Sequence, residues 1–140
     1  MLHEALVKYG YGVTTIQGAL TPEDRDKIVK EFRDGLTQVL IATDVLARGF
    51  DQFTVNMVVN YDLPVINKNP TEPDYEGYLH CVGRAGLKGA VFNLLCGDRD
   101  NMIMEKVERH FNHYATEYSN ILIMLGSKKT HLSRSEFGSD

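Results

Sequence analysis

Apolar residues along the chain recur with two different periods, and segments of the two kinds alternate. Spacing of three and four residues predicts amphipathic helices, whereas short runs rich in β-branched residues predict strands. The predicted helices span 1–10, 21–35, 74–80 and 98–114, and the predicted strands span 13–18, 38–43, 54–64 and 89–95. Such alternation is typical of an α/β fold in three layers, with a mainly parallel sheet between helices on both faces.

The helix predicted over 21–35 carries the clearest start and stop signals. Thr21 is a common N-cap residue, Pro22 suits the first helical position, and Gly35 ends the pattern. Apolar residues at helical spacing predict which helix faces point inward. These inward positions are Leu2, Leu6 and Tyr9 in the first helix, Ile28, Val29 and Phe32 in the second, and Ile103, Val107 and Phe111 in the last.

Proline content and polarity identify the remaining segments. Residues 38–43 are apolar almost throughout, which predicts a fully buried strand. Pro64 ends the strand over 54–64, and residues 65–74, which hold two of the four prolines, are expected to form a loop. The last segment, 119–140, becomes polar and loses its periodicity, which predicts a disordered tail.

Composition narrows the function classes. The chain has 140 residues, which suits one domain, and its net charge of −4 excludes a protein that coats nucleic acid through a basic surface. Cys81 and Cys96 have neither metal-ligand nor disulfide-framework spacing, so no metal site is predicted and a reducing compartment fits best. The sequence shows no leader peptide and no apolar run long enough to span a bilayer, so no membrane partner is expected.

A cluster of polar residues follows the apolar strand predicted over 38–43, in the stretch ATDVLARGFDQ. Functional groups of parallel α/β folds gather at the carboxyl ends of strands. Here Thr43 can donate to a phosphate oxygen, and Arg48 can bind one through its charge and paired N–H groups. Gly49 allows a ligand backbone to approach closely.

The two carboxylates of the same stretch repel phosphate and therefore need a different role. Asp44 and Asp51 can accept hydrogen bonds from ribose hydroxyls or orient an arginine. The cluster thus suits a nucleotide or a sugar-phosphate chain. An alternative is that Asp44 and Arg48, four residues apart, only pair with each other at a helix start.

A second cluster, HCVGRAGLKG, precedes the last predicted strand and places His80, Arg84 and Lys88 at intervals of four residues among glycines. Together with ATDVLARGFD and NYDLP, this pattern resembles the C-terminal RecA-like domain of DEAD-box ATP-dependent RNA helicases. VLIATDVLARGFD resembles motif V of that family, and HCVGRAG resembles a degenerate motif VI. FRDG and VVNYDLP stand where the family has similar strings, and the resemblance covers 1–118. The loop PVINKNPTEPDYEGYLH is similar to the subgroup that acts in messenger RNA export.

The resemblance implies an RNA-binding role for five residues. It places Gly18 close to the RNA backbone and Arg25 in a helix that supports the RNA contact. Thr43, Arg48 and Gly49 would contact RNA phosphates or brace that surface. The alternatives are that Gly18 is only a turn glycine and that Arg25 is a solvated helix charge.

The resemblance also implies a nucleotide side. Asp51 would accept a hydrogen bond from the ATP ribose or from a motif VI arginine. His80 would couple the nucleotide and RNA sites. Arg84 would reach the γ-phosphate as an arginine finger, which stabilises the charge of the transition state.

The sequence departs from the family in motif VI, whose pattern is H-R-x-G-R-x-G-R. Cys81 and Leu87 stand at arginine positions, a few residues are absent before Lys88, and a lysine lacks the planar fork of an arginine. Weak or absent ATP hydrolysis is therefore expected. The chain also starts after the family's first strand and contains neither the Walker A phosphate loop nor the DEAD tetrapeptide. Hence it is predicted to be inactive alone, with ATP and Mg²⁺ bound only together with an N-terminal helicase domain.

Three functional hypotheses remain. The first is the C-terminal half of an ATP-dependent RNA helicase that acts in messenger RNA export, in cytoplasm and nucleus. Its expected partners are RNA, an N-terminal RecA-like domain and export or nuclear-pore factors. The second is a catalytically inactive fragment that binds RNA or a protein partner. The third is an unrelated α/β domain that binds a small phosphate ligand.

Overall fold

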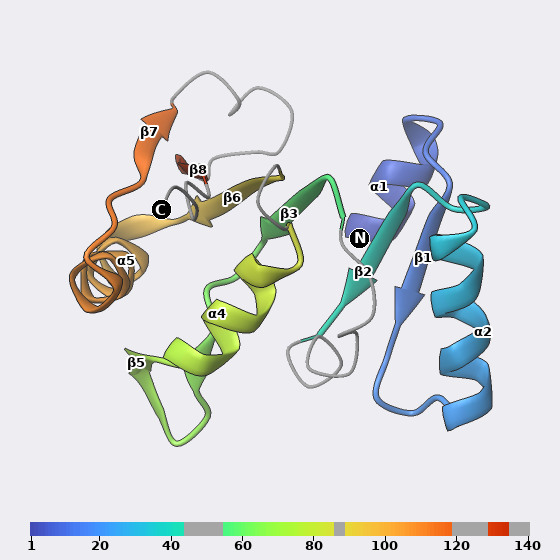
Figure 1. Ribbon diagram of the computed structural model, residues 1–140, viewed down its shortest axis with the longest axis horizontal. Helices are drawn as coiled ribbons and strands as arrows, with labels where there is room; N and C mark the ends of the chain where they lie inside the picture. Colours follow the sequence, from blue (N-terminus) through green and yellow to red (C-terminus); the bar gives the residue numbers. More distant parts are fainter. Residues whose placement is uncertain (44–54, 86–88, 119–128, 135–140) are drawn as a thin grey trace, which may run out of the picture. The chain divides into compact units, whose positions relative to one another are not determined.

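The computed structural model describes residues 1–43, 55–85, 89–118 and 129–134. The chain divides into two compact units, Met1–Phe53 and Thr54–Asp140, whose elements are labelled in Figure 1. Each unit combines helices with a pair of parallel strands. The α/β fold class predicted from the alternating pattern is therefore confirmed.

The first unit contains four elements in the order helix, strand, helix, strand. They are α1 (Leu2–Lys8), β1 (Val13–Ile16), α2 (Pro22–Arg33) and β2 (Val39–Ala42). β1 and β2 are parallel, with Val13 opposite Val39 and Ile16 opposite Ala42. Each predicted element of this part of the chain is thus present, with shorter bounds.

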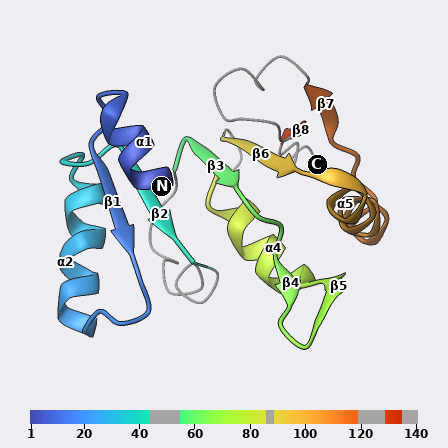
Figure 2. The same cartoon turned by 180° about the vertical axis from the view of Figure 1, so that it is seen from behind.

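The two helices of this unit cover opposite faces of the strand pair. Ile16 is fully buried and packs against Leu20 and Ile28 on the α2 side. Its neighbour Thr15 points to the other face, because successive side chains of a strand alternate. There the Thr15 hydroxyl lies 2.9 Å from Nδ1 of His3, a residue of α1. Figures 1 and 2 agree, since β1 lies between α1 and α2 in both views.

The predicted ends of α2 are confirmed. The Thr21 hydroxyl accepts a hydrogen bond from the Asp24 N–H at 3.2 Å, and the helix begins at Pro22. Gly35 follows the helix with a φ of 79°, a value that glycine adopts easily. At the C-cap, a hydrogen bond from Lys30 holds the pKa of the Asp34 carboxyl below its ordinary value.

Burial in the first unit is lower than predicted. α1 has no buried residue, and Tyr9 is 75% exposed, so the inward face predicted for this helix is wrong at Tyr9. The first three residues of β2 are partly buried and its last is exposed, where a fully buried strand was predicted. The physical reason is that, among the described residues, β2 pairs on one side only, with β1.

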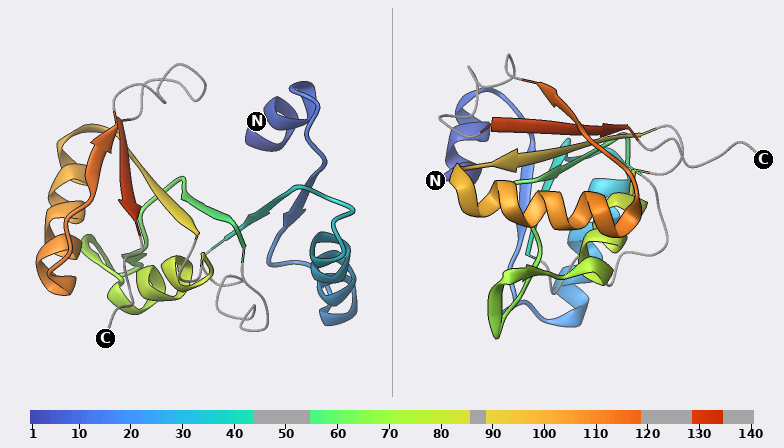
Figure 3. Two further views of the ribbon diagram at one scale, coloured as in Figure 1. Left: turned by 45° about the horizontal axis from the view of Figure 1, so that its top comes forward. Right: turned by 90° about the vertical axis from the view of Figure 1, so that its left-hand side faces the viewer.

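The second unit is built around a mixed sheet. Its elements are β3 (Met57–Asn60), β4 (Val65–Ile66), β5 (Asn69–Pro73), α4 (Tyr75–Gly83), β6 (Ala90–Leu95), α5 (Gly97–Phe111), β7 (Thr116–Tyr118) and β8 (Lys129–Arg134). The strand order is β3-β6-β8-β7, where β3 and β6 are parallel and β8 runs antiparallel to both of its neighbours. α5 runs along one side of this sheet (Figure 3).

The core of the second unit joins both helices to the sheet. Its buried members are Leu63, Tyr78, Leu95, Ile103, Met104 and Val107. The inward face predicted for the last helix is confirmed, because Ile103 and Val107 are each 2% exposed and Phe111 packs against the same core.

The segment predicted as a loop over 65–74 is instead a β-hairpin. β4 and β5 pair antiparallel, and the Asp74 N–H closes the base by donating to the Pro64 carbonyl at 3.0 Å. α5 anchors the hairpin, because Arg99 donates to the Pro70 carbonyl at 2.8 Å and Lys106 pairs with Glu72. Figure 2 shows this hairpin below α4. Contacts from a distant helix therefore order a segment that has no strand pattern of its own.

Two other expectations are corrected. The strand predicted over 54–64 ends at Asn60, before the proline that was expected to stop it. Within the tail predicted to be disordered over 119–140, residues 129–134 form β8 and pair with β6. Backbone hydrogen bonds make this strand, so a polar sequence can form it without apolar periodicity. Residues 119–128 and 135–140 lie outside the described residues.

One pair of glycines in α4 gives a matched stability test. Asp74 caps the helix by accepting from the Gly77 N–H at 2.9 Å, and a Cβ at position 77 would lie 2.6 Å from Asp74 Oδ2. A Cβ at Gly83 would meet no atom of the described residues within 4 Å. Gly77→Ala is expected to be about 1–2 kcal/mol less stable than Gly83→Ala, since losing a cap costs this much. Urea unfolding of both variants measures the difference, and equal stabilities would contradict the proposed clash.

Candidate functional site

The first unit places three of the predicted RNA-binding residues around one end of its strand pair. Gly18 lies in the turn after β1, and Thr43 directly follows β2. Because the two strands are parallel, both residues lie at the carboxyl edge of the pair. Arg25 lies in the first turns of α2, the helix that starts from the same edge.

The side chains at this edge have open capacity for a ligand. Thr43 is exposed. The Nε atom of Arg25 is buried and has no hydrogen-bond partner within the described part of the chain. An unpaired buried N–H is costly, so a partner that accepts from Arg25 would be stabilising.

Nothing in the described part of the chain requires a glycine at position 18. The φ of Gly18 lies outside the left-handed range found at Gly10 and Gly35, and a Cβ built on it would meet no described atom within 4 Å. Neither backbone conformation nor packing among the described residues therefore calls for glycine at this turn. The remaining predicted residues of this stretch, Arg48, Gly49 and Asp51, lie outside the described residues.

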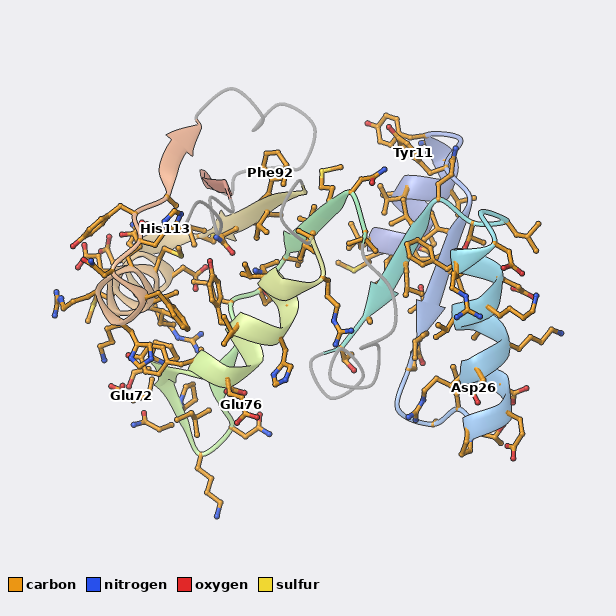
Figure 4. The ribbon with its side chains drawn as sticks, in the orientation of Figure 1. Tyr11, Asp26, Glu72, Glu76, Phe92 and His113 are labelled. Atoms are coloured by element: carbon orange, nitrogen blue, oxygen red, sulfur yellow. The ribbon has the colours of Figure 1, made fainter. Side chains whose placement is uncertain are left out.

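The second unit carries two of the three predicted nucleotide-side residues, His80 and Arg84, on one helix. Glu76, His80 and Arg84 follow one another at intervals of four along α4, and Arg84 is its C-cap. Tyr78 is 6% exposed and points into the core. Figure 4 shows Glu76 projecting from α4 on the side away from β3 and β6. His80 and Arg84 lie on the same side of the helix as Glu76. We call these three residues the outer stripe of α4.

The ring of His80 has a defined proton position. Its Nδ1 lies 2.8 Å from the main-chain oxygen of Glu76. A carbonyl oxygen only accepts, so Nδ1 must carry the hydrogen. In the neutral ring Nε2 is then an acceptor, which suits it to bind a hydroxyl or N–H group.

The C-terminal end of α4 is tied to the residues that enter β3. The Val55 N–H donates to the Arg84 carbonyl at 2.8 Å, and the Ala90 N–H donates to the Asn56 carbonyl at 3.0 Å. Val55 is the first described residue after the segment 44–54. The backbone of Arg84 is therefore fixed to the chain that follows the ATDVLARGFDQ stretch.

The helicase conserved C-terminal domain model matches residues 1–89, which is more than half of the chain. The chain belongs to this helicase C-terminal family.

The relatives of this helicase domain are DEAD-box proteins, which confirms the predicted resemblance. This chain is 62% identical to DEAD-box ATP-dependent RNA helicase 38 of Arabidopsis thaliana over 114 residues. These residues cover 79% of this chain and 23% of the relative. The chain thus spans about a quarter of the length of the curated relatives it matches.

Solved structures of the Saccharomyces cerevisiae DEAD-box protein Dbp5 are also similar to this domain. A variant of its C-terminal domain bound to a Gle1 variant and IP6 superposes with a TM-score of 0.71 at 37% identity, covering 79% of this chain and 62% of that chain. Dbp5 bound to RNA and ADP BeF3 gives a TM-score of 0.68 at 36% identity, covering 79% of this chain and 28% of that chain.

One polar network of the helicase domain was not predicted. Asn60 Nδ2 donates to Asn93 Oδ1 at 2.8 Å, and Asn93 Nδ2 donates to the Tyr78 hydroxyl at 3.1 Å. We call these three residues the amide–phenol network. The only signal in the sequence is an asparagine in each of two apolar strands, MVVN and AVFNLL, and these asparagines face each other in the β3–β6 register.

The predicted site residues therefore fall into two sets. Gly18, Arg25 and Thr43 lie in the first unit, whereas His80 and Arg84 lie in the second. Within the ranges that the structure describes, no cluster of three or more histidine, cysteine, aspartate or glutamate side chains could hold a metal ion. No helix in these ranges is long and apolar enough to cross a membrane.

Proposed function

We propose that this helicase domain is the C-terminal half of an ATP-dependent DEAD-box RNA helicase and contributes contacts to the RNA backbone. The observation that carries the proposal is the carboxyl edge of β1 and β2. There Thr43 is exposed, Arg25 Nε has no hydrogen-bond partner among the described residues, and no described atom would contact a Cβ at Gly18. Donors and a glycine suit a phosphate chain, and the Dbp5 structure with RNA and ADP BeF3 supports this ligand class.

On the nucleotide side, we assign Arg84 and His80 to ATP held by an N-terminal helicase domain, with Mg²⁺ bound there. During hydrolysis a water oxygen bonds to the γ-phosphorus while the bond to the β-phosphate oxygen breaks. Arg84 would stabilise the negative charge on the γ-phosphate oxygens. His80 would accept through Nε2 from a donor that comes with the nucleotide or with the other domain. Asp51 is assigned to the ATP ribose or to an arginine, and Arg48 and Gly49 to the RNA backbone.

The same relatives support a proposal for the protein partners. A Dbp5 C-terminal domain binds Gle1 and IP6. We assign this domain a comparable factor of messenger RNA export, with action in both nucleus and cytoplasm. Support for this narrower assignment comes from the hairpin over 65–73, which stands where the export subgroup has a similar loop.

A second function is favoured by motif VI. Cys81 occupies a position where the family carries an arginine, so the charge available to a phosphate is reduced. In this alternative the domain binds RNA or a protein partner without ATP hydrolysis. Both functions share the RNA-binding edge, which is therefore the first to test.

Gly18→Val is expected to weaken binding of a single-stranded RNA by about 10-fold, because a branched side chain would separate the edge from the phosphate backbone. Gly12→Ala is the matched control, since Gly12 precedes β1 at the opposite end and a Cβ there makes ordinary contacts of 3.6 Å or more. Fluorescence anisotropy at several salt concentrations measures both affinities. Equal affinities, or no salt-dependent RNA binding by the unmodified chain, would contradict the proposed RNA-binding edge.

A further inference from the structure

The helix that carries His80 and Arg84 is held by the amide–phenol network inside an otherwise apolar core. Asn60 is 6% exposed, Asn93 is fully buried and Tyr78 is 6% exposed. The two hydrogen bonds lead from β3 through β6 to α4. Phe92, labelled in Figure 4, projects from β6 away from α4, as expected if the alternate residue Asn93 faces α4.

The network differs from the apolar contacts around it in being directional. The Tyr78 ring stacks on Phe111 with centroids 6.0 Å apart and packs in the core with Leu63 and Leu95. Such packing depends weakly on small rotations of a helix about its axis. A hydrogen bond weakens steeply when its angle changes, so the bond from Asn93 to the Tyr78 hydroxyl favours one rotation of α4.

Rotation of α4 decides where the outer stripe points. Each residue of a helix is turned by about 100° from the one before, so His80 and Arg84 lie on the side of α4 away from Tyr78. The bond from Val55 to the Arg84 carbonyl fixes one end of the helix at a point near its axis. The hydrogen bond to the Tyr78 hydroxyl lies off the axis and adds a directional attachment to the ring contacts of Tyr75 with His110 and of Tyr78 with Phe111.

We infer that Asn60, Asn93 and Tyr78 are positioning residues, which set the rotation of α4 and so the direction in which His80 and Arg84 meet the nucleotide. The inference rests on the proposed function, because it adds positioning residues to the same nucleotide-facing helix. It extends the site by three residues that are buried in the core.

The test uses this chain joined to the N-terminal RecA-like domain of the Arabidopsis relative. The measured quantity is the factor by which ADP–BeF3 tightens the binding of single-stranded RNA. Tyr78→Phe removes one oxygen and keeps the ring. We expect it to reduce this factor by about 10-fold, as small misplacements of reacting groups do, while RNA affinity without nucleotide stays unchanged. Tyr114→Phe is the matched control, since Tyr114 is 70% exposed.

A second variant separates positioning from stability. The triple change Asn60→Leu, Asn93→Leu and Tyr78→Phe replaces every member of the network by an apolar residue of similar shape. Such a replacement can leave stability nearly unchanged, because each of the two described hydrogen bonds loses its donor and its acceptor together. We expect this variant to unfold at the same urea concentration as the unmodified protein and to lose the nucleotide-dependent tightening. A stable triple variant with an unchanged factor would show that the network is only structural.

Arg84→Lys separates the positioning role of the network from the assignment of Arg84 to the nucleotide. If Arg84→Lys lowers the factor and both network variants leave it unchanged, the positioning inference is wrong and the proposed function stands. If Arg84→Lys has no effect, the assignment of Arg84 to the nucleotide is wrong, and the positioning inference is overturned with it. A reduced factor in all three variants, with Tyr114→Phe unchanged, supports both.

Discussion

ATP hydrolysis by this chain joined to the N-terminal domain of the Arabidopsis relative is expected to be about 10²-fold or more below that of the intact relative. Removing one group that stabilises transition-state charge costs about 10²–10³ in rate, and Cys81 and Leu87 both replace arginines of the family pattern. Cys81→Arg combined with Leu87→Arg is expected to recover at least about 10-fold, because a guanidinium can bind phosphate oxygens with two parallel N–H groups. RNA-stimulated release of inorganic phosphate measures all three rates.

The control for this gain adds the same charge elsewhere. Leu36→Arg with Met102→Arg places two arginines at positions that are 73% and 59% exposed and lie outside both motif clusters. This pair should leave the rate unchanged. Equal gains from the two pairs would mean that net charge, and not motif VI, limits hydrolysis. Hydrolysis by the unmodified chain at the rate of the intact relative would contradict the prediction directly.

The largest expected loss of stability follows from Asn93→Ala. The side chain of Asn93 is fully buried, and its removal leaves the Asn60 amide buried without its partner and opens a cavity beside Tyr78. An unsatisfied buried donor costs about 1–3 kcal/mol, and the lost packing adds to this. We expect a loss of about 3–4 kcal/mol, a large share of the stability of an ordinary domain.

Chemical denaturation, followed by circular dichroism, measures this loss. Asn67→Ala is the matched control, because Asn67 lies exposed in the hairpin turn and should change stability by less than about 0.5 kcal/mol. A similarly small effect of Asn93→Ala would mean that water or a rearranged side chain can replace the missing amide. The triple apolar variant should be far more stable than Asn93→Ala, although it removes more polar atoms.

The elements that the sequence predicts correctly are those with local signals. Thr21, Pro22 and Gly35 define the ends of α2 through contacts within a few residues, and Ile103 and Val107 define a buried helix face by spacing alone. Nothing in these signals depends on a distant part of the chain. They therefore remain valid in the folded structure.

The elements that the sequence did not predict depend on distant partners. The hairpin over 65–73 is ordered by side chains of α5, about thirty residues further along, and β8 is a strand because β6 offers it backbone partners. Asn60 and Asn93 are isolated polar residues in two apolar strands, and only the parallel register shows that they lie opposite each other. Such information appears only when the register of the sheet is known.

The candidate site shows the same division. The resemblance to a helicase family predicted site residues that the structure describes. They are Gly18, Arg25, Thr43, His80 and Arg84. The sequence could not show that Gly18 lacks a steric reason to be glycine, or that the His80 ring donates through Nδ1. Both facts depend on the course of the backbone. The structure thus adds a hydrogen-bonding role to His80 and open space to Gly18, neither of which the motif match provides.

The attachment of the hairpin to α5 also bears on how this region can change during evolution. Arg99 recognises the main-chain carbonyl of residue 70, a group that every amino acid carries. A substitution at position 70 therefore keeps the carbonyl that Arg99 contacts. The contact with α5 can hold the hairpin in the same orientation whatever residue stands there. The turn at its tip can drift in sequence, and acquire new contacts, while its location on the domain is retained.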